Sequence, residues 1–308
     1  MIADARSPSG SIDDAPLPRL WKAPVSRPGD LTGPLVALTV DVEDWYQSCV
    51  DIDARISERV LRNMDRVLSV FDECGVKGTF FVQGRVAETF PKLVQSLVAE
   101  GHEVQSHGYS HRPLFSLDQK GLRTELERAR KTVEDACGMP VTAFRAQDFS
   151  VLRHNLWALE VMGEIGFTVD SSIFPMRTRR YGISGWELSP HYLALSSGDA
   201  ILEVPVAIWE VRGMRFPVAG GGYFRILPQR LLVRGLRSIV ASGRPAVIYC
   251  HPYEFNPEEL SDFRTKVPMR VLLSQGFGRG SFTQRVKGLL SRLSCGRFDE
   301  VLAAWGVT

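Results

Sequence analysis

The sequence contains few cysteines, and their spacing fits neither a disulfide framework nor a thiolate metal site. The five cysteines among 308 residues are an odd number, are widely spaced and form no CxxC pair. Disulfide-rich secreted domains carry an even, dense set, and structural zinc sites carry closely spaced pairs. We therefore expect free thiols and a reducing compartment.

Long apolar runs and a strong excess of one charge are also missing. No stretch reaches the ~18 apolar residues that a membrane span requires. The amino terminus has neither a basic start nor an apolar run, so we expect no signal peptide and a cytoplasmic protein. A net charge of +2, from 37 Lys and Arg against 35 Asp and Glu, argues against a dedicated nucleic-acid binder, and we expect no nucleic-acid partner.

The composition is instead that of a globular protein, with 44% hydrophobic and 23% charged residues. Residues 1–33 hold several Pro, Ser, Gly and Asp and show no periodicity, so we expect a flexible leader outside the folded unit. From residue 35, short β-branched segments alternate with helical patterns; one predicted helix is capped by Ser57 and ends at Gly75. This alternation predicts a parallel α/β sheet, either open and doubly wound or closed as a barrel.

Residues suited to acid–base and metal chemistry follow the ends of several predicted strands. They are Asp41, His107, Arg145, Asp170 and His251. In a (β/α) barrel, residues from many strand ends converge on one face. An open sheet concentrates its site at a switch point, usually beside a glycine-rich first turn, and no such turn follows the first strand. The pattern therefore favours the barrel.

Two histidines and three acids form the most informative groups. His107 and His111 are four residues apart in SHGYSH, which places both imidazoles on one side of a turn, as two ligands of one metal require. A capped or surface pair without metal is the alternative. Asp41, Glu43 and Asp44 follow a single apolar strand in TVDVEDW. Buried carboxylates need a cation or a donor, so the acids favour a metal site; solvated caps of the turn are the alternative.

Six motifs, in order, resemble those of the polysaccharide deacetylase family, also called NodB-homology or carbohydrate esterase family 4. They are TVDVEDW, SHGYSH, FRAQDFS, VDSSIFP, GGGYFRILP and IYCHPYEF. The sequence is most similar to the branch with a DVED motif and an extra C-terminal segment, found in exopolysaccharide gene clusters. The resemblance implies one domain over residues 34–308, including that segment from about residue 256, with a distorted (β/α) barrel fold. It implies a metal-dependent hydrolase that removes N-acetyl groups from an amino sugar of a polysaccharide or peptidoglycan-type glycan.

The resemblance also implies the acid–base residues. Asp41 is the general base, Arg145 pairs with it, and His251 is the general acid. A histidine needs an orienting carboxylate to be protonated at neutral pH, and Glu203 is the candidate; an ordinary strand-edge acid is the alternative. The backbone N–H of Asp148 is expected to stabilise the oxyanion of the bound substrate.

The implied cofactor is a divalent metal, with zinc the expected ion, bound by His107 and His111. The third ligand is Glu43 or Asp44, and strand alternation favours Glu43. Tyr223 after the run of three glycines and Trp45 beside the acids are substrate-binding candidates; a tight turn over the core and a core side chain are the respective alternatives.

Three positions depart from the family pattern. Gln147 stands where proline is common, Asp148 stands where a small or aromatic residue is usual, and Gly108 replaces the hydroxyl residue common after the first histidine. None of them removes a metal or acid–base residue, so we expect activity with an altered substrate preference. Two other functions stay open: a same-fold amidohydrolase on a non-acetyl or non-glycan amide, such as a deformylase or an allantoinase-like enzyme, and a glycan-binding protein with a degenerate site.

The segment from Asp262 to Arg297 carries eight Lys or Arg against one acid. A solvated helix face is the usual meaning of such charge. The alternative is a docking surface for an anionic glycan, for a membrane surface or for a partner in the exopolysaccharide machinery. The oligomeric state is left open.

Overall fold

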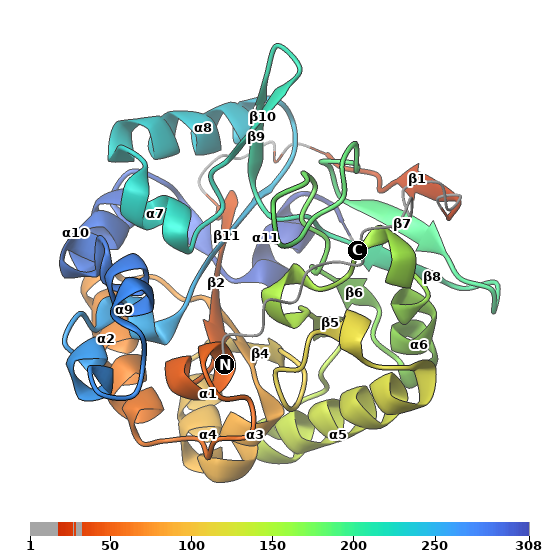
Figure 1. Cartoon of the computed structure of the whole chain (residues 1–308). Coiled ribbons are helices and arrows are strands. Elements are labelled where there is room, and N and C mark those ends of the chain that lie inside the picture. Colours follow the sequence, from red (N-terminus) through yellow and green to blue (C-terminus); the bar gives the residue numbers. More distant parts are fainter. Residues whose placement is uncertain (1–17, 27, 29–32, 308) are drawn as a thin grey trace.

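Parallel strands form the centre of the molecule. The computed structural model describes residues 18–26, 28 and 33–307, and its main sheet has the order β1-β7-β8-β6-β5-β4-β3-β2-β11 (Figure 1). The parallel members are β2 (Val36–Val42), β3 (Thr79–Val82), β4 (Glu103–Ser106), β5 (Ala143–Phe144), β6 (Val169–Asp170), β8 (Ala200–Glu203) and β11 (Ala246–Cys250). β12 (Cys295–Gly296) also pairs with β2 in parallel, whereas β1 (Leu20–Lys22) and β7 (His191–Ala194) are antiparallel.

Helices surround these strands, as the alternation predicted (Figure 1). The longer ones are α2 (Arg59–Cys74), α4 (Pro91–Ala99), α5 (Gln119–Cys137), α6 (Ala158–Ile165), α8 (Gln229–Ala241), α9 (Met269–Gly276) and α10 (Arg279–Leu290); the shorter ones are α1 (Trp45–Cys49), α3 (Gly84–Thr89), α7 (Gly222–Ile226) and α11 (Phe298–Ala304). Every residue of β2 is buried. Strands covered on both faces need such continuous apolar runs.

The segment after β8 connects the two sides of the parallel sheet. The N–H of Val204 donates to the carbonyl of Asp170 in β6 (2.8 Å), and three residues later the N–H of Ala207 donates to the carbonyl of Val247 in β11 (2.9 Å). The sheet therefore curves back on itself through an irregular segment instead of a full strand. The predicted α/β fold is confirmed, and these bonds give it the form of a distorted barrel. Among the described residues, no helix combines the length and apolar character needed to cross a membrane.

One end of α2 differs from the prediction. Gly75 ends the helix in the left-handed conformation (φ 64°), as expected. Ser57 is not its cap; its N–H and its hydroxyl both donate to Oδ2 of Asp44, at 2.8 and 2.5 Å. The Ser57 hydroxyl, which was predicted to cap the start of α2, thus stabilises the turn after β2 instead.

Part of the predicted leader belongs to the sheet. β1 pairs with β7, Ala23 is buried, and the N–H of Ser26 donates to the carbonyl of Trp305 (2.8 Å). The expectation of a flexible leader is therefore wrong for residues 18–26, while residues 1–17, 27 and 29–32 lie outside the described part of the chain. A three-residue strand is too short for apolar periodicity to indicate it.

Removing β1 is expected to destabilise the protein. A chain that begins at residue 27 loses the bonds from Ala23 to Pro190, from Ala194 to Arg19 and from Ser26 to Trp305. At about 1 kcal/mol each, the loss is about 3 kcal/mol, or roughly 5 °C in Tm. Thermal unfolding followed by circular dichroism, with a chain that begins at residue 18 as the control, measures it. Equal Tm values for the two chains would show that β1 adds nothing.

Candidate active site

The carboxyl ends of the central strands bring the predicted polar residues together. The group consists of Asp41, Glu43, His107, His111, Arg145 and His251. Asp41 is in β2, and the others follow β2, β4, β5 and β11. All except His251 are buried, and the side chain of His251 is 19% exposed. Residues far apart in the sequence therefore form one site at one end of the sheet, where barrel enzymes carry their chemistry.

Glu43, His107 and His111 lie in a metal-binding arrangement. Their candidate ligand atoms all lie within 4.8 Å of one another. The Nε2 atom of His107 is 3.7 Å from Oε2 of Glu43, and Nε2 of His111 contacts the same oxygen. Nδ1 of His107 is hydrogen-bonded to the carbonyl of Arg145 (2.9 Å), which leaves Nε2 directed at the group. Two imidazoles and a carboxylate, one ring held by a backbone carbonyl, fit a divalent metal such as zinc.

The charges of this group have the pattern that a cation needs. Burial disfavours the charged carboxyl of Glu43, but His111 and His107 hold its pKa well below the usual range. Burial likewise disfavours the charged imidazole of His111, yet Glu43 raises the pKa of that ring. The buried carboxylate of Glu43 thus keeps its negative charge because positively charged imidazoles lie beside it. A divalent ion bound at this point would supply positive charge in the same place.

Asp44 has a different role from its neighbour. Its Oδ1 accepts the N–H groups of Tyr46 (2.9 Å) and Gln47 (3.3 Å), which caps α1. Its Oδ2 accepts both donors of Ser57. Because both oxygens are used by protein donors, Asp44 lies outside the group formed by Glu43 and the histidines.

Asp41 forms a buried ion pair with Arg145. Nη1 of Arg145 lies 2.9 Å from Oδ1 of Asp41 and donates to Oγ1 of Thr39 at 2.6 Å. Nη2 donates to Oγ of Ser171 (3.1 Å), and the guanidinium stacks 4.2 Å above the ring centre of Phe81. An arginine fixed on several sides compensates the charge of Asp41 and fixes where the carboxylate points.

His251 is oriented by Glu254 and not by Glu203. Oε2 of Glu254 lies 3.2 Å from Nδ1 of His251 and accepts the backbone N–H of His251 at 3.1 Å, while Oε1 pairs with Nε of Arg225 at 3.1 Å. Burial disfavours the protonated ring, but the hydrogen bond and charge of Glu254 raise the pKa of His251 to about 9. The role predicted for Glu203 is therefore wrong. Glu254 was missed although HPYEF places it three residues after the histidine, one turn of a 3-10 helix away.

Glu203 instead forms a buried pair with Asp170, its register partner on β6. Burial, together with Asp170, raises the pKa of the Glu203 carboxyl well above its usual range. Oε1 of Glu203 accepts the N–H of Ile173 (3.2 Å), and Asp170 accepts the hydroxyl of Ser172. This pair supports the chain beside Arg145, since Ser172 in turn accepts the N–H of Ala146 (2.8 Å).

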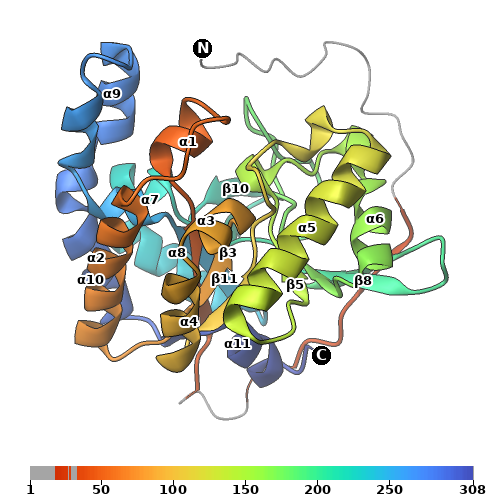
Figure 2. The same ribbon diagram turned by 90° about the horizontal axis from the view of Figure 1, so that it is seen from below.

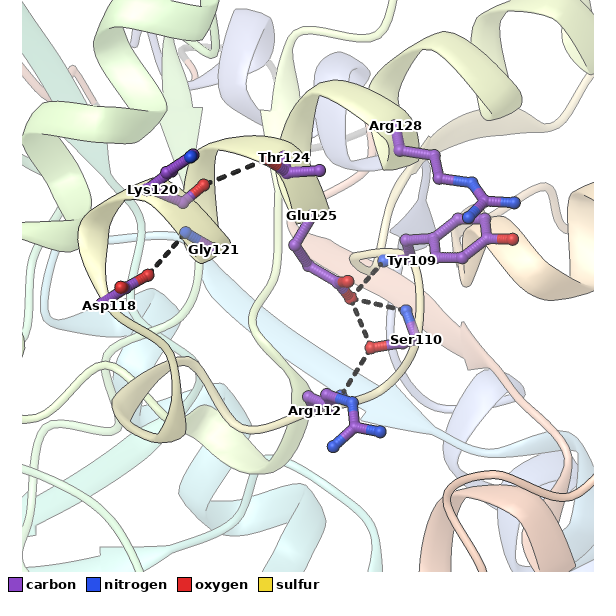
Figure 3. Close-up of a pocket in the computed structure, with 9 residues that line it drawn as sticks. All are labelled: Tyr109, Ser110, Arg112, Asp118, Lys120, Gly121, Thr124, Glu125 and Arg128. Carbon is purple, nitrogen blue, oxygen red and sulfur yellow. Dashed lines mark hydrogen bonds between the residues drawn. The ribbon is translucent and has the colours of Figure 1, made fainter.

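The loop between the two histidines is held by Glu125 of α5. Oε1 of Glu125 accepts the N–H groups of Tyr109 (3.2 Å) and Ser110 (2.6 Å) and the hydroxyl of Ser110 (2.7 Å), as Figure 3 shows. From the other side, Nε2 of Gln47 donates to the carbonyl of Ser110 (2.9 Å). His111 itself has φ 68°, a conformation that a non-glycine residue keeps only when its surroundings impose it. Sequence reasoning did not identify Glu125.

Glu125→Ala is therefore expected to weaken metal binding about tenfold, because groups that orient metal ligands contribute 10- to 100-fold to affinity. Glu125→Gln retains an oxygen that can accept hydrogen bonds from the same donors, so this variant should keep most of the metal affinity. Glu127→Ala, at an exposed position on the same helix, is the control. Competition with a fluorescent chelator measures the affinity, and an unchanged affinity in Glu125→Ala would show that the loop holds its shape without this carboxylate.

Two of the three departures from the family pattern, Gly108 and Gln147, are neighbours in space. A Cβ atom at Gly108 (φ 70°) would lie 1.9 Å from Nε2 of Gln147. The side chain of Gln147 is fully buried and fills the space that a larger residue at 108 would occupy. The glycine and the glutamine therefore fit each other, and the first-histidine loop is kept intact.

The substrate-binding candidates differ in their surroundings. Trp45 is fully buried against Phe263 (ring centres 5.2 Å apart), so its predicted contact with substrate is wrong and its alternative, a core side chain, holds. Tyr223 is half-buried, and Asp148 is exposed with φ 54° and a carboxylate 3.2 Å from Nη2 of Arg180. A Cβ at Gly220 would lie 1.7 Å from the carbonyl oxygen of Tyr249, so the glycine run forms a tight turn over β11.

An α/β fold with two histidines and a carboxylate grouped at the strand ends is typical of metal-dependent hydrolases. Comparison with known families narrows this class: residues 29–168 match the polysaccharide deacetylase family. Residues 171–303 match a domain of unknown function, DUF3473. The sheet runs through both ranges, because β2 of the first pairs with β11 and β12 of the second.

Curated relatives match part of the chain. A chitooligosaccharide deacetylase of Rhizobium leguminosarum bv. trifolii is 25% identical over 142 residues, 46% of this chain and 58% of that protein. A peptidoglycan-N-acetylglucosamine deacetylase of Bacillus cereus is 29% identical over 96 residues, 31% of this chain and 35% of that protein. The chain thus spans less than two thirds of the length of either relative.

Solved structures share the whole fold. A putative polysaccharide deacetylase from Mycobacterium smegmatis superposes with a TM-score of 0.59 at 18% identity, covering 93% of this chain and 95% of that one. Puue allantoinase superposes with a TM-score of 0.57 at 13% identity, covering 89% and 90%. These likenesses establish the fold alone, and an allantoinase has it as well as a deacetylase.

Proposed function

We propose that this protein is a metal-dependent deacetylase that hydrolyses the N-acetyl group of an amino sugar in a polysaccharide or peptidoglycan-type glycan. The observation that carries the proposal is the juxtaposition of two groups: the Glu43, His107 and His111 cluster, and the Asp41–Arg145 ion pair. The matches to deacetylases in the first half of the chain favour this substrate class over the same-fold amidohydrolases.

In this proposal, Glu43, His107 and His111 hold a divalent metal, with zinc the expected ion. When bound, the metal supplies Lewis acidity toward the acetamide carbonyl and lowers the pKa of the attacking water. Asp44 stabilises the turn and is not a ligand. The choice between the two acids rests on the four donors that occupy the oxygens of Asp44.

The chain's own residues move the protons. Asp41, oriented by Arg145, accepts a proton from water as the oxygen of that water attacks the acetyl carbon. The N–H of Asp148 stabilises the negative charge that develops on the carbonyl oxygen. His251, oriented by Glu254, donates a proton to the amide nitrogen as the carbon–nitrogen bond breaks. The products are acetate and a free amino sugar.

Acetate release from N-acetylglucosamine oligomers tests the proposal. The purified full-length chain, loaded with zinc, should release acetate, and dialysis against a chelator should abolish release until metal is returned. Allantoin and N-formyl sugars are the comparison substrates. Hydrolysis of either of these without acetate release would assign the site to another amide, and tight glycan binding without any hydrolysis would assign it to recognition.

A further inference from the structure

An exposed apolar stripe runs along α9. Met269, Leu273 and Phe277 recur every four residues and are 58%, 67% and 64% exposed, and Ile226 at the end of α7 is 65% exposed. The two helices are joined at this point, because Nη1 of Arg225 donates to the carbonyl of Phe277 (3.2 Å). Single exposed apolar residues are ordinary, but four large ones on adjoining helix ends form a patch of the kind that marks an interaction site.

The helix that carries the stripe packs against the rest of the chain through its opposite side. On its opposite side, Leu272 is buried in a small cluster with Trp45, Tyr253 and Phe263. α9 has a buried face that contacts the wall of the active site and an outer face with no partner among the described residues.

The charges beside the stripe all have one sign. The side chains of Arg264, Lys266 and Arg270 are exposed and form no hydrogen bond or ion pair within the described part of the chain. Residues 263–298 contain no Asp or Glu. The exposed acids that precede this segment in the sequence are already paired, Asp262 with Arg59 and Glu258 with Arg66. An anionic surface would thus meet three unpaired cations, while these two acids are already neutralised by arginines.

The stripe lies at the end of the molecule where the active site lies. In Figure 2, α9 and α1 both project at the end of the molecule where β2 leads into α1, and α1 follows directly after Glu43 and Asp44. Arg225, which contacts Phe277, is also the partner of Glu254, the residue that orients His251. A surface that met the stripe would therefore lie beside the mouth of the site.

We propose that the outer face of α9 docks on an anionic phospholipid membrane. The surface consists of Ile226, Met269, Leu273 and Phe277, with Arg264, Lys266 and Arg270 beside them. Apolar side chains on one helix face, with cations in and just before the helix, are typical of a helix that lies in the plane of a membrane interface; here Arg270 belongs to α9, and Arg264 and Lys266 precede it. Each cation near an anionic bilayer strengthens binding roughly fivefold, which gives the arrangement its lipid preference.

The chemistry favours a membrane over the other occupants. A second copy of the chain would bring the three unpaired cations toward their own equivalents, which is repulsive. Binding of sugars relies on polar groups placed to accept hydrogen bonds, and the stripe is mostly aliphatic. Docking would hold the site beside glycan carried at the membrane surface, and it does not depend on which amide the site hydrolyses.

Sedimentation of the full-length chain with vesicles tests the proposal. The chain should bind vesicles of phosphatidylcholine with phosphatidylglycerol and bind phosphatidylcholine alone at least tenfold more weakly. Leu273→Asp combined with Phe277→Asp should weaken binding at least tenfold, and the charge reversals Lys266→Glu and Arg270→Glu should do the same. Met139→Asp is the matched control, because Met139 is 54% exposed and precedes β5, at the other end of the sheet.

Circular dichroism confirms that each variant is folded, and Leu273→Ser with Phe277→Ser replaces the aspartate pair if that pair unfolds. Failure of the unmodified chain to bind anionic vesicles would overturn the proposal. So would equal binding by the double variant and the Met139 control. A dimer in solution that the double variant dissociates would show instead that a second copy covers the stripe.

Discussion

Glu43→Gln should lower the affinity for metal at least a hundredfold and leave the fold intact. Asp44→Asn should instead keep the metal bound and lower the stability of the fold. Glu43 faces both histidines and holds no other element in place, so neutralising it removes the one negative ligand of the group. In Asp44→Asn, an amide that takes the place of Oδ2 cannot accept the two donors of Ser57, which costs about 1–3 kcal/mol. Metal content after dialysis and thermal unfolding, measured on both variants, separate the two effects.

The pair of variants is its own control, because the residues are adjacent and equally buried. Asp44→Asn tests whether any change in this turn disturbs the metal. If it loses metal while Glu43→Gln keeps it, the ligand is Asp44. If both lose metal to the same degree, the turn after β2 and not one carboxylate determines binding.

Asp41→Asn should lower turnover by about 10³-fold or more while metal stays bound. Asparagine keeps the shape of the side chain but cannot take a proton from water, and general-base catalysis contributes about 10²–10⁴-fold. The substitution also leaves the buried Arg145 without its counter-ion, so some loss of stability is expected. Acetate release and metal content are measured together on the folded variant.

Asp53→Asn is the matched control for this change, since Asp53 is an exposed aspartate on the loop after α1. It should retain full turnover. Substantial deacetylation by Asp41→Asn would remove the base from this position even if the metal site is right. Loss of metal in the variant would mean that Asp41 acts on the metal and not on the proton.

The sequence predicted which residues lie close together wherever a single strand or turn determines their positions. Strand ends predicted that Asp41, His107, Arg145 and His251 would meet, and the spacing of four residues predicted that His107 and His111 would face one point. The choice of Glu203 as partner of His251 failed because the sequence offered two carboxylates, Glu203 on a distant strand and Glu254 one turn away. Only the closed shape of the sheet selects between them.

Other failures have a similar cause. β1 pairs with β7 across 170 residues of sequence, and three residues carry no periodic signal of their own. Trp45 is covered by Phe263 and Leu272, which come from the C-terminal segment, so its burial depends on packing that the motif around it does not contain. Glu125 could not be predicted for a similar reason. It binds mainly the backbone N–H groups of the histidine loop, and backbone groups place no requirement on which residues form that loop.

The position of β2 has a consequence for how the chain is made. β11 pairs with one edge of β2 and β12 with part of the other edge, and these two strands come some 210 and 260 residues later in the chain. Such distant pairing slows folding, and an unpaired apolar strand edge is a template for aggregation until its partner arrives. The first range, 29–168, therefore cannot complete its own sheet when expressed alone. In a nascent chain, the edges of β2 stay without these partners until residues 246–250 and 295–296 have left the ribosome, and exposed strand edges of this kind are what chaperones protect during synthesis.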